Sequence, residues 1–320
     1  MNVLIIGGGG FIGQKLARAL VARGELNGRA LKSISLVDVV EPGPIEGGCI
    51  RVDTSICDIT DKASVAEALT ADVDVVYLLA AIVSAHAEED FDAGWNINMM
   101  GTLNVLERAR ELGSKPRVVF TSSIAVYGGE VPDPIVDHSL LNPQTSYGAQ
   151  KAVGELLIND YSRKGYIDGV GFRLPTISVR PGKPNRAASS FMSSIMREPL
   201  NGQEAICPVD ADFAHYYLSP RKCIENLIKG AELKAEDMGQ NRCMMMPGHM
   251  WTIGQMIDAL TAVAGPEPAK LIKWEAQPEV QAIVKGWRFD IRPTKALQLG
   301  LSADESFEDN VRYYIEDDRP

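Results

Sequence analysis

The chain has 320 residues, of which 45% are hydrophobic, enough to fill one large core or a large and a small one. Its formal net charge of −10 disfavours nucleic acid and anionic membrane surfaces as partners. Five cysteines without a CxxC spacing, no secretory signal pattern and no apolar run of 18 residues together predict a cytoplasmic protein with free thiols.

Short apolar runs alternate with amphipathic stretches of helical length over the first 175 residues. Strands buried on both faces are expected at 3–6, 34–39, 49–52, 74–80, 117–123 and 170–174. Helices are expected between them at 12–23, 61–70, 92–112 and 146–163. This alternation predicts an α/β fold with a Rossmann-type doubly wound parallel sheet, which binds ligands at the carboxyl ends of its strands.

After about residue 180 the pattern changes to helical stretches separated by Pro and Gly. Helices are expected near 187–198, 220–232, 252–264, 277–285 and 304–316. We therefore expect a first domain over residues 1–180 and a smaller, mostly helical substrate-binding lobe over 181–320. Some segments of the second part, such as 215–232, are expected to return to the first domain.

A glycine-rich turn follows the first predicted strand in "VLIIGGGGFIG", where Gly7, Gly10 and Gly13 stand at a GxxGxxG spacing. Glycines in such a turn bring the N–H groups of the following helix close to a pyrophosphate. A flexible turn is the alternative reading. The position between a strand and a helix favours a dinucleotide site.

Two aspartates follow the next predicted strands. Asp38 ends the second strand, where its carboxylate can accept hydrogen bonds from both ribose hydroxyls of an adenosine. A 2′-phosphate would meet this negative charge, so the sequence predicts NAD rather than NADP, although Asp38 could also be a turn residue. Asp58 follows the third strand and is placed either to meet the adenine edge or to cap the helix that begins at 61.

The segment "TSYGAQK" (145–151) places a phenol and an amine four residues apart, on one face of a predicted helix. The Lys151 ammonium can then stabilise the phenolate of Tyr147, whose free pKa would be about 10. A lone YxxxK pattern is common and usually inert. Here it follows a dinucleotide turn and a strand-end serine, Ser123, which favours a proton-transfer role for Tyr147.

These motifs, in this order, resemble the extended short-chain dehydrogenase/reductase family. Further matching segments are "LLAA" (78–81), "NINMMGTLNVLE" (96–107), "TSSIAVYGG" (121–129) and "RLPTISVRPG" (173–182). The resemblance implies that Ser123, Tyr147 and Lys151 are the catalytic set and that residues 1–180 are an NAD-binding domain. The cofactor contacts that it implies are Gly7, Gly10, Phe11, Ile12, Gly13, Asp38, Asp58, Ile59, Leu79, Ala80, Ala81, Asn98, Tyr147, Lys151, Leu174 and Pro175.

Departures from the family pattern narrow the reaction. Ile124 and Ala125 stand where dehydratases of the family carry an Asp-Glu pair, and "ADFAHYYLSP" (211–220) lacks the arginine that helps epimerases bind a nucleotide diphosphate. The chain is most similar to family members that oxidise the C2 hydroxyl of a four-carbon sugar acid with NAD. A nucleotide-sugar 4-epimerase, another aldonate or uronate dehydrogenase, and a non-catalytic NAD sensor are the alternatives.

The substrate carboxylate needs a charged or strongly polar partner, which the basic segment "VRPGKPNR" (179–186) can supply. A solvated, proline-stiffened linker is the alternative reading of this segment. Ser84 and Thr176 are placed to bind substrate hydroxyls, or are plain turn and strand-end residues. The expected substrate contacts are Ser84, Ser122, Ser123, Tyr147, Thr176, Arg180, Lys183, Asn185 and Arg186.

No metal site is expected, because the four histidines show no ligand spacing and are expected at the surface or at a pocket rim; they are His86, His138, His215 and His249. The resemblance also implies a homodimer. Members of this family commonly pack the two long helices, here near 92–112 and 146–163, into a four-helix contact.

Overall fold

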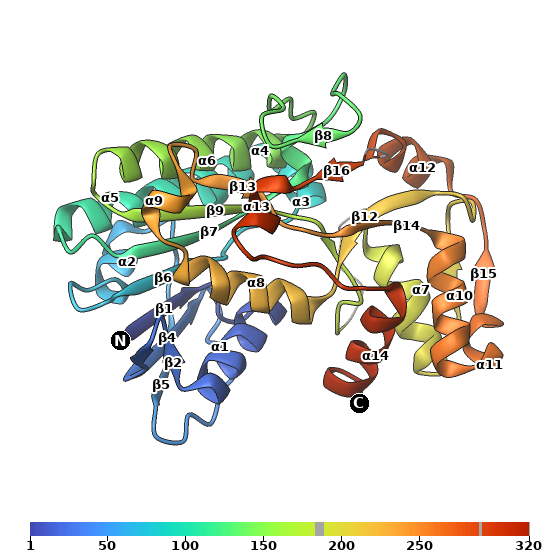
Figure 1. The fold of residues 1–320 in the computed structure, drawn as a ribbon, viewed down its shortest axis with the longest axis horizontal. Helices are drawn as coiled ribbons and strands as arrows, with labels where there is room; N and C mark the ends of the chain where they lie inside the picture. Colours follow the sequence, from blue (N-terminus) through green and yellow to red (C-terminus); the bar gives the residue numbers. More distant parts are fainter. Residues whose placement is uncertain (183–188, 288–289, 320) are drawn as a thin grey trace. The chain divides into compact units, whose positions relative to one another are not determined.

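The chain divides into two compact units in a computed structural model that describes residues 1–182, 189–287 and 290–319 (Figure 1). Unit 1 comprises Met1–Val126, Pro143–Arg173 and Ile224–Met245. Unit 2 comprises Tyr127–Asn142, Leu174–Cys223 and Met246–Pro320. The two units are therefore interleaved along the chain rather than consecutive.

Unit 1 is built on a seven-stranded sheet with the order β13-β9-β7-β6-β1-β4-β5. The strands are β1 (Asn2–Ile6), β4 (Ser33–Asp38), β5 (Arg51–Ile56), β6 (Val75–Leu78), β7 (Arg117–Ser123), β9 (Asp168–Leu174) and β13 (Cys243–Met245). The central strand β1 pairs in parallel with both β4 and β6. Every residue of β6 is buried, as the continuous apolar run predicts for a strand covered on both faces.

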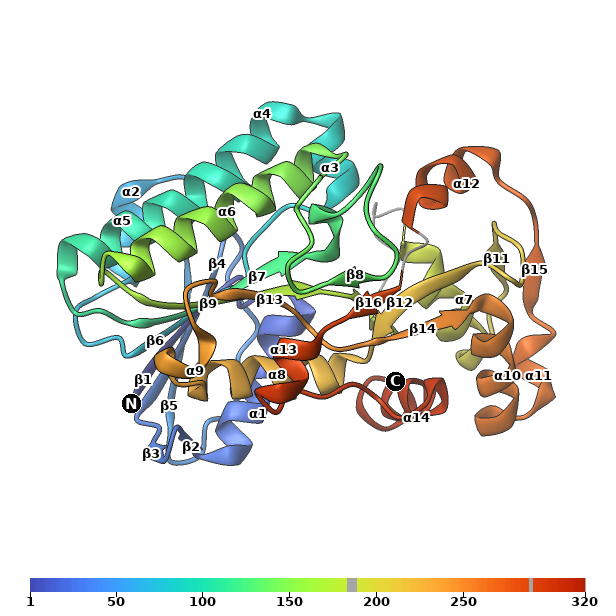
Figure 2. The ribbon, with the colours of Figure 1, turned by 45° about the horizontal axis from the view of Figure 1, so that its top comes forward.

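Helices cover both faces of this sheet, with α5 and α6 on one side and α1 and α8 on the other (Figures 1 and 2). Two glycines show how closely they approach. A Cβ on Gly154 of α6 would lie 2.6 Å from Phe120 in β7, and one on Gly230 of α8 would lie 2.3 Å from Phe172 in β9. The predicted α/β class and doubly wound parallel sheet are confirmed.

Unit 1 has helices over the ranges expected at 12–23, 61–70, 92–112, 146–163 and 220–232, and further short elements that were not predicted. They are α1 (Phe11–Arg23), the hairpin strands β2 (Glu25–Leu26) and β3 (Arg29–Ala30), α2 (Lys62–Ala68), α3 (Ser84–Glu89), α4 (Phe91–Gly94), the π-helix η1 (Trp95–Gly101), α5 (Thr102–Leu112), the 3₁₀ turn η2 (Ile124–Val126), α6 (Ser146–Arg163), α8 (Pro220–Glu232), of which residues from Ile224 belong to this unit, and α9 (Ala235–Met238). The stretch expected as one helix at 92–112 is thus α4, η1 and α5 in succession.

The expectation that the run at 49–52 is a strand buried on both faces is wrong. The strand is β5, which begins at Arg51 and is the last in the sheet order, so it pairs only with β4. None of its residues is buried, and the side chain of Ile56 is 66% exposed. An apolar run alone does not distinguish such an edge strand from a central one.

Unit 2 combines helices with short strand pairs. Its elements are β8 (Ile135–Val136), β10 (Thr176–Ile177), α7 (Ser190–Leu200), β11 (Ala205–Cys207), β12 (Ala214–Leu218), β14 (His249–Thr252), α10 (Ile253–Ala264), α11 (Pro266–Ala269), β15 (Ile272–Trp274), α12 (Pro278–Val284), η3 (Lys285–Trp287), β16 (Ile291–Arg292), α13 (Thr294–Gln298) and α14 (Phe307–Asp317). Strands β10, β12 and β14 form a three-stranded sheet.

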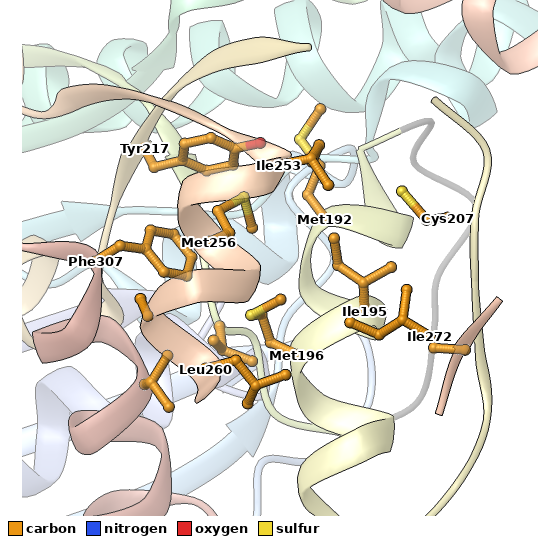
Figure 3. Packing of buried hydrophobic residues seen from close by; sticks show 14 of the residues in the cluster. Met192, Ile195, Met196, Cys207, Tyr217, Ile253, Met256, Leu260, Ile272 and Phe307 are labelled. Carbon is orange, nitrogen blue, oxygen red and sulfur yellow. The ribbon is translucent and has the colours of Figure 1, made fainter. Parts of the chain in front are cut away.

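The core of unit 2 forms where the apolar faces of α7 and α10 meet (Figure 3). Met192 and Met196 of α7 and Met256 and Leu260 of α10 are fully buried there, together with Phe307 of α14. On each of these two helices the named residues are four positions apart, which places them on one face. Over the described residues, no helix has the length and apolar character that crossing a membrane requires.

Candidate active site

The glycine turn after β1 is shaped for close backbone contacts. Gly7 has a φ of +92°, and a Cβ there would lie 2.6 Å from the backbone nitrogen of Ala80, which follows β6. A Cβ on Gly13 would lie 2.4 Å from the carbonyl oxygen of Gly7, so α1 begins directly against the turn. Only glycine fits at these two positions without displacing the backbone.

The backbone N–H groups at the N-terminus of α1 can donate hydrogen bonds to an anion. Gly10 is its N-cap residue, and no side chain in the described part of the chain caps it. The first N–H groups of a helix have no partner within the helix, and the helix dipole favours negative charge at that end. Turn and helix end therefore fit the pyrophosphate of a dinucleotide.

Asp38 is held beside this turn at the end of β4. Its Oδ2 accepts a hydrogen bond from the Gly9 N–H at 3.0 Å, and its Oδ1 accepts one from the Val39 N–H at 2.8 Å. A carboxylate has about four lone-pair positions, so Asp38 keeps acceptor capacity for two ribose hydroxyls. Its fixed position fits the predicted selection of NAD.

Asp58 does not cap the helix that follows it. The N-cap of α2 is Asp61, whose side chain accepts hydrogen bonds from the N–H groups of Ala63 at 3.0 Å and Ser64 at 3.3 Å. Asp58 is exposed, and its Oδ1 accepts from the Thr60 N–H and hydroxyl, each at 2.8 Å. The capping alternative is therefore wrong, and the contact with adenine stays a prediction.

Lys151 of α6 is buried, and its Nζ donates a hydrogen bond to the Thr121 carbonyl of β7 at 2.8 Å. The same Nζ lies 5.0 Å from the ring centroid of Phe120 and 5.8 Å from that of Tyr147, one helical turn earlier. Burial lowers the pKa of Lys151 to about 8, because the charged amine loses its hydration. The Lys151 amine thus lies beside the Tyr147 ring, and its effect on the Tyr147 hydroxyl stays a prediction.

The start of α6 packs against the chain that follows β7. Thr145 caps the helix by accepting from the Gly148 N–H at 3.1 Å, and a Cβ on Gly148 would lie 2.2 Å from the Ala125 carbonyl oxygen. Ser123 is two residues before that carbonyl, and its Oγ accepts from the Ala125 N–H at 3.1 Å. The structure therefore brings together the segments that carry Ser123, Tyr147 and Lys151.

Ser122 does not join this group. Neighbouring residues of a strand point to opposite faces, and the Ser122 hydroxyl donates to Glu155 Oε1 at 2.6 Å in the interior. Arg173 of β9 binds the same carboxylate with both its Nε and its Nη2, at 2.7 to 3.1 Å. This buried ion pair was not predicted; its signal in the sequence is a Glu four residues after Lys151 on the same helix face.

Asn98, a predicted cofactor contact, is buried in η1 and joins two segments by hydrogen bonds. Its Oδ1 accepts from the Ile82 N–H at 2.9 Å, and its Nδ2 donates to the Ile82 carbonyl at 3.2 Å and to Gln150 Oε1 at 2.8 Å. Asn98 thereby fixes the loop after β6 against α6. A contact of Asn98 with the cofactor stays a prediction.

Other predicted cofactor contacts line the same sheet edge. The N–H groups of Leu79 and Ala80 donate to the Ile6 carbonyl at 2.9 and 3.0 Å, which sets the path of the chain after β6. Ile59 is buried against Gly101 of η1, where a Cβ would lie 2.6 Å from the Ile59 side chain. Ser84, a predicted substrate contact, is half-buried at the first position of α3.

In unit 2, Thr176 lies in β10 with its Oγ1 2.8 Å from His215 Nε2. His215 was expected at the surface or a pocket rim, and this expectation is wrong: its side chain is buried between aromatic rings. His215 and Tyr217 share one face of β12, and the ring of Phe213, the residue directly before this strand, stacks on His215. Burial lowers the pKa of His215 to about 4.

The basic segment is only partly described. The guanidinium of Arg180 is half-buried and donates to the Ile177 carbonyl at 3.0 Å and to Ser189 Oγ at 2.8 Å. The other candidates for the carboxylate lie outside the described residues; they are Lys183, Asn185 and Arg186. Within the described ranges, no cluster of three or more His, Cys, Asp or Glu side chains could hold a metal ion.

The chain matches a known protein family, and it matches two relatives over nearly its full length. The model of the "NAD dependent epimerase/dehydratase family" matches residues 3–212. A D-erythronate dehydrogenase of Cupriavidus necator is 49% identical over 321 residues, covering 99% of this chain and 98% of the relative. One of Haemophilus influenzae is 42% identical over 318 residues, covering 99% of this chain and 100% of the relative.

A solved structure shares the fold closely. It is described as a nucleoside-diphosphate-sugar epimerase from Agrobacterium tumefaciens and superimposes with a TM-score of 0.95 at 44% identity. The match covers 99% of this chain and 94% of that one. The relatives therefore carry names from two reaction classes, a dehydrogenase and an epimerase.

Proposed function

Because the chain belongs to the NAD-dependent epimerase/dehydratase family, we propose that it oxidises the C2 hydroxyl of a small sugar acid, namely D-erythronate to 2-dehydro-D-erythronate. It is an NAD-dependent oxidoreductase. The observation that carries the proposal is the buried ammonium of Lys151 beside the ring of Tyr147, packed against the end of β7 where Ser123 stands. An epimerase would share this set, and the two full-length relatives named D-erythronate dehydrogenase support the choice of the dehydrogenase.

The proposed roles follow from the chemistry of each side chain. Tyr147 takes the proton of the C2 hydroxyl, since the neighbouring cation of Lys151 favours its phenolate. Ser123 orients the reacting oxygen by a hydrogen bond. The bound NAD would supply the acceptor for the hydride that leaves C2. Positioning of these groups accounts for much of the rate.

The cofactor site is proposed on the residues that the geometry makes suitable. The turn at Gly7 and the start of α1 at Gly10 hold the pyrophosphate, Asp38 holds the ribose, and Asp58 meets the adenine. The basic segment from Arg180 onward is proposed to bind the substrate carboxylate. The cysteines are free and four of them are buried, which supports the proposal that the enzyme acts in a reducing compartment such as the cytoplasm.

An absorbance assay separates the dehydrogenase from the epimerase. With D-erythronate and NAD, we expect a steady rise at 340 nm, whereas an epimerase returns its hydride and shows no net NADH. A panel of three- to six-carbon aldonates and uronates tests the other sugar acids. Conversion of a nucleotide sugar without NADH, and no rise with any acid, would make the epimerase the correct function.

The choice of NAD is tested at Asp38. Replacing Asp38 with Gly removes both the ribose acceptor and the negative charge, so NAD should bind more weakly and the preference for NAD over NADP should shrink. Titration of both cofactors measures the effect. Asp53→Gly on the neighbouring strand β5 is the matched control. A wild type that prefers NADP would show that Asp38 does not have the proposed role.

We also propose a homodimer. Three large apolar side chains of unit 1 are exposed on α4, η1 and α6: Phe91 by 59%, Trp95 by 36% and Leu156 by 64%. The rings of Phe91 and Trp95 stack with centroids 6.1 Å apart, and the helices that carry them run beside α6 (Figures 1 and 2). Exposed apolar groups gathered on neighbouring helices are typical of a protein interface.

A further inference from the structure

We propose that the Thr176 hydroxyl can only accept a hydrogen bond from the substrate, because it donates its own proton to His215. Thr176 would then select a hydroxyl group of the sugar acid and would not bind its carboxylate. This inference rests on the proposed function for the identity of the substrate. Its structural part rests on Thr176, His215 and Trp287, all within unit 2.

The backbone fixes which ring nitrogen of His215 carries a proton. His215 Nδ1 lies 3.3 Å from the Trp287 carbonyl oxygen. A carbonyl oxygen can only accept a hydrogen bond, so Nδ1 must be the donor. A neutral imidazole has one N–H, and its Nε2 then has a lone pair and no proton.

The surroundings of His215 keep the ring neutral. Its imidazole lies 5.3 Å from the ring of Tyr217, 5.7 Å from that of Trp287 and 6.4 Å from that of Phe213, measured between centroids. An imidazolium enclosed by such rings would lose its hydration without a carboxylate to replace it. Burial accordingly lowers the pKa of His215 to about 4, so the ring is neutral near pH 7.

The tautomer of His215 determines whether the Thr176 hydroxyl donates or accepts a hydrogen bond. A hydroxyl has one proton to donate and two lone pairs to accept with. At 2.8 Å from an Nε2 that can only accept, the Thr176 hydroxyl must donate its proton to the ring. Its oxygen is then left with acceptor capacity alone. A substrate hydroxyl can donate to it, whereas a carboxylate, which only accepts, would be repelled.

Different residues would then bind the hydroxyl and the carboxylate of the substrate. Thr176 was predicted to bind a substrate hydroxyl, and in this contact the substrate hydroxyl would donate and the Thr176 oxygen would accept. Ser122 is committed to Glu155, so neither residue is available to donate to the carboxylate. The positive groups of the basic segment remain the candidates for the carboxylate, which agrees with the proposed function.

Nuclear magnetic resonance tests the polarity without any substrate. In protein labelled with ¹³C and ¹⁵N at its four histidines, the His215 signals are assigned by their loss in His215→Gln. We expect the neutral Nδ1–H tautomer from pH 5 to 9. In Thr176→Val the tautomer should persist, because Trp287 sets it, while the Nε2 shift should change. A ring that titrates near pH 6.5, or carries its proton on Nε2, would overturn the inference.

Substrate analogues test the selection. D-erythronate is compared with analogues in which the C3 or the C4 hydroxyl is replaced by hydrogen or by fluorine, which cannot donate. At the position that Thr176 contacts, both replacements should lower kcat/KM of the wild type by a similar factor, about 10-fold, mostly through KM. Thr176→Val should lose this discrimination, and Thr176→Ser should keep it.

Two results would contradict the selection. One is a fluorine analogue that performs as well as D-erythronate while the hydrogen analogue does not, since Thr176 would then be donating. The other is a Thr176→Val variant that keeps the full discrimination at both positions. If the wild type does not oxidise D-erythronate at all, the proposed function fails, and the resonance experiment still decides the polarity of Thr176.

Discussion

Tyr147 and Lys151 are the residues on which the proposed chemistry depends. Tyr147→Phe keeps the ring and removes only the hydroxyl, so oxidation should fall by about 10²- to 10⁴-fold, the usual contribution of a positioned base. NAD binding, measured by titration, should barely change. Tyr161→Phe is the matched control, because it removes a hydroxyl from the same helix, one that bonds to Glu107. Activity of Tyr147→Phe within a few-fold of wild type would exclude Tyr147 from the mechanism.

The buried amine also makes a prediction about stability and pH. Burial lowers the pKa of Lys151 from its ordinary 10.5 to about 8, so between these values the unfolded chain binds more protons than the folded chain. The free energy of unfolding should therefore rise as pH increases from about 8 to 10.5, and below pH 8 the buried charge costs about 3 kcal/mol.

Urea unfolding of wild type and Lys151→Met at pH 7.5 and pH 10.5 isolates this contribution. The variant lacks the titrating group, so its stability relative to wild type should be higher at pH 7.5 than at pH 10.5. Lys164→Met, at the exposed end of α6, should show no such change. An equal difference at both pH values would mean that Lys151 is not desolvated in the folded protein.

At the scale of elements, the pair of Glu155 and Arg173 joins α6 to β9, and Ser122 joins β7 to the same carboxylate. Glu155→Gln leaves the Arg173 guanidinium buried without its charge partner, which should cost about 3 to 5 kcal/mol. Glu155→Met with Arg173→Met removes both charges and should recover most of that loss. Urea unfolding measures both variants. A double variant no more stable than Glu155→Gln would show that the pair contributes more than mutual neutralisation.

The elements also show what a sequence can reveal. Buried runs such as 75–78 and the helical periods of α1 and α6 were predictable, because continuous burial and amphipathic faces leave direct patterns. The approach of Lys151 to the Tyr147 ring was predictable because the two residues are four positions apart on one helix. The exposure of β5 and the burial of His215 depend on neighbours from distant segments. Local patterns do not contain that information.

At the scale of the whole molecule, the chain passes between the two units several times. The segment Ile224–Met245 supplies β13 and most of α8 to unit 1, although it follows α7 and β12 of unit 2 in the chain. Strand β13 pairs with β9 through Cys243, Met244 and Met245. A fragment ending at residue 180 would contain Ser123, Tyr147 and Lys151 but would lack an edge strand and a covering helix of the sheet that supports them.

The proposed dimer is tested by charging the exposed apolar residues of η1 and α6. Trp95→Glu with Leu156→Glu places two charges among the exposed apolar groups of η1 and α6, so it should convert a dimer to a monomer in light scattering after size exclusion. Both side chains are exposed in the single chain, so the fold itself should be unaffected by circular dichroism. Ile206→Glu with Trp274→Glu charges two exposed apolar residues of unit 2 and should leave the dimer intact. A wild-type chain that is monomeric at micromolar concentration, or a dimer that the first variant retains and the second loses, would place the interface elsewhere.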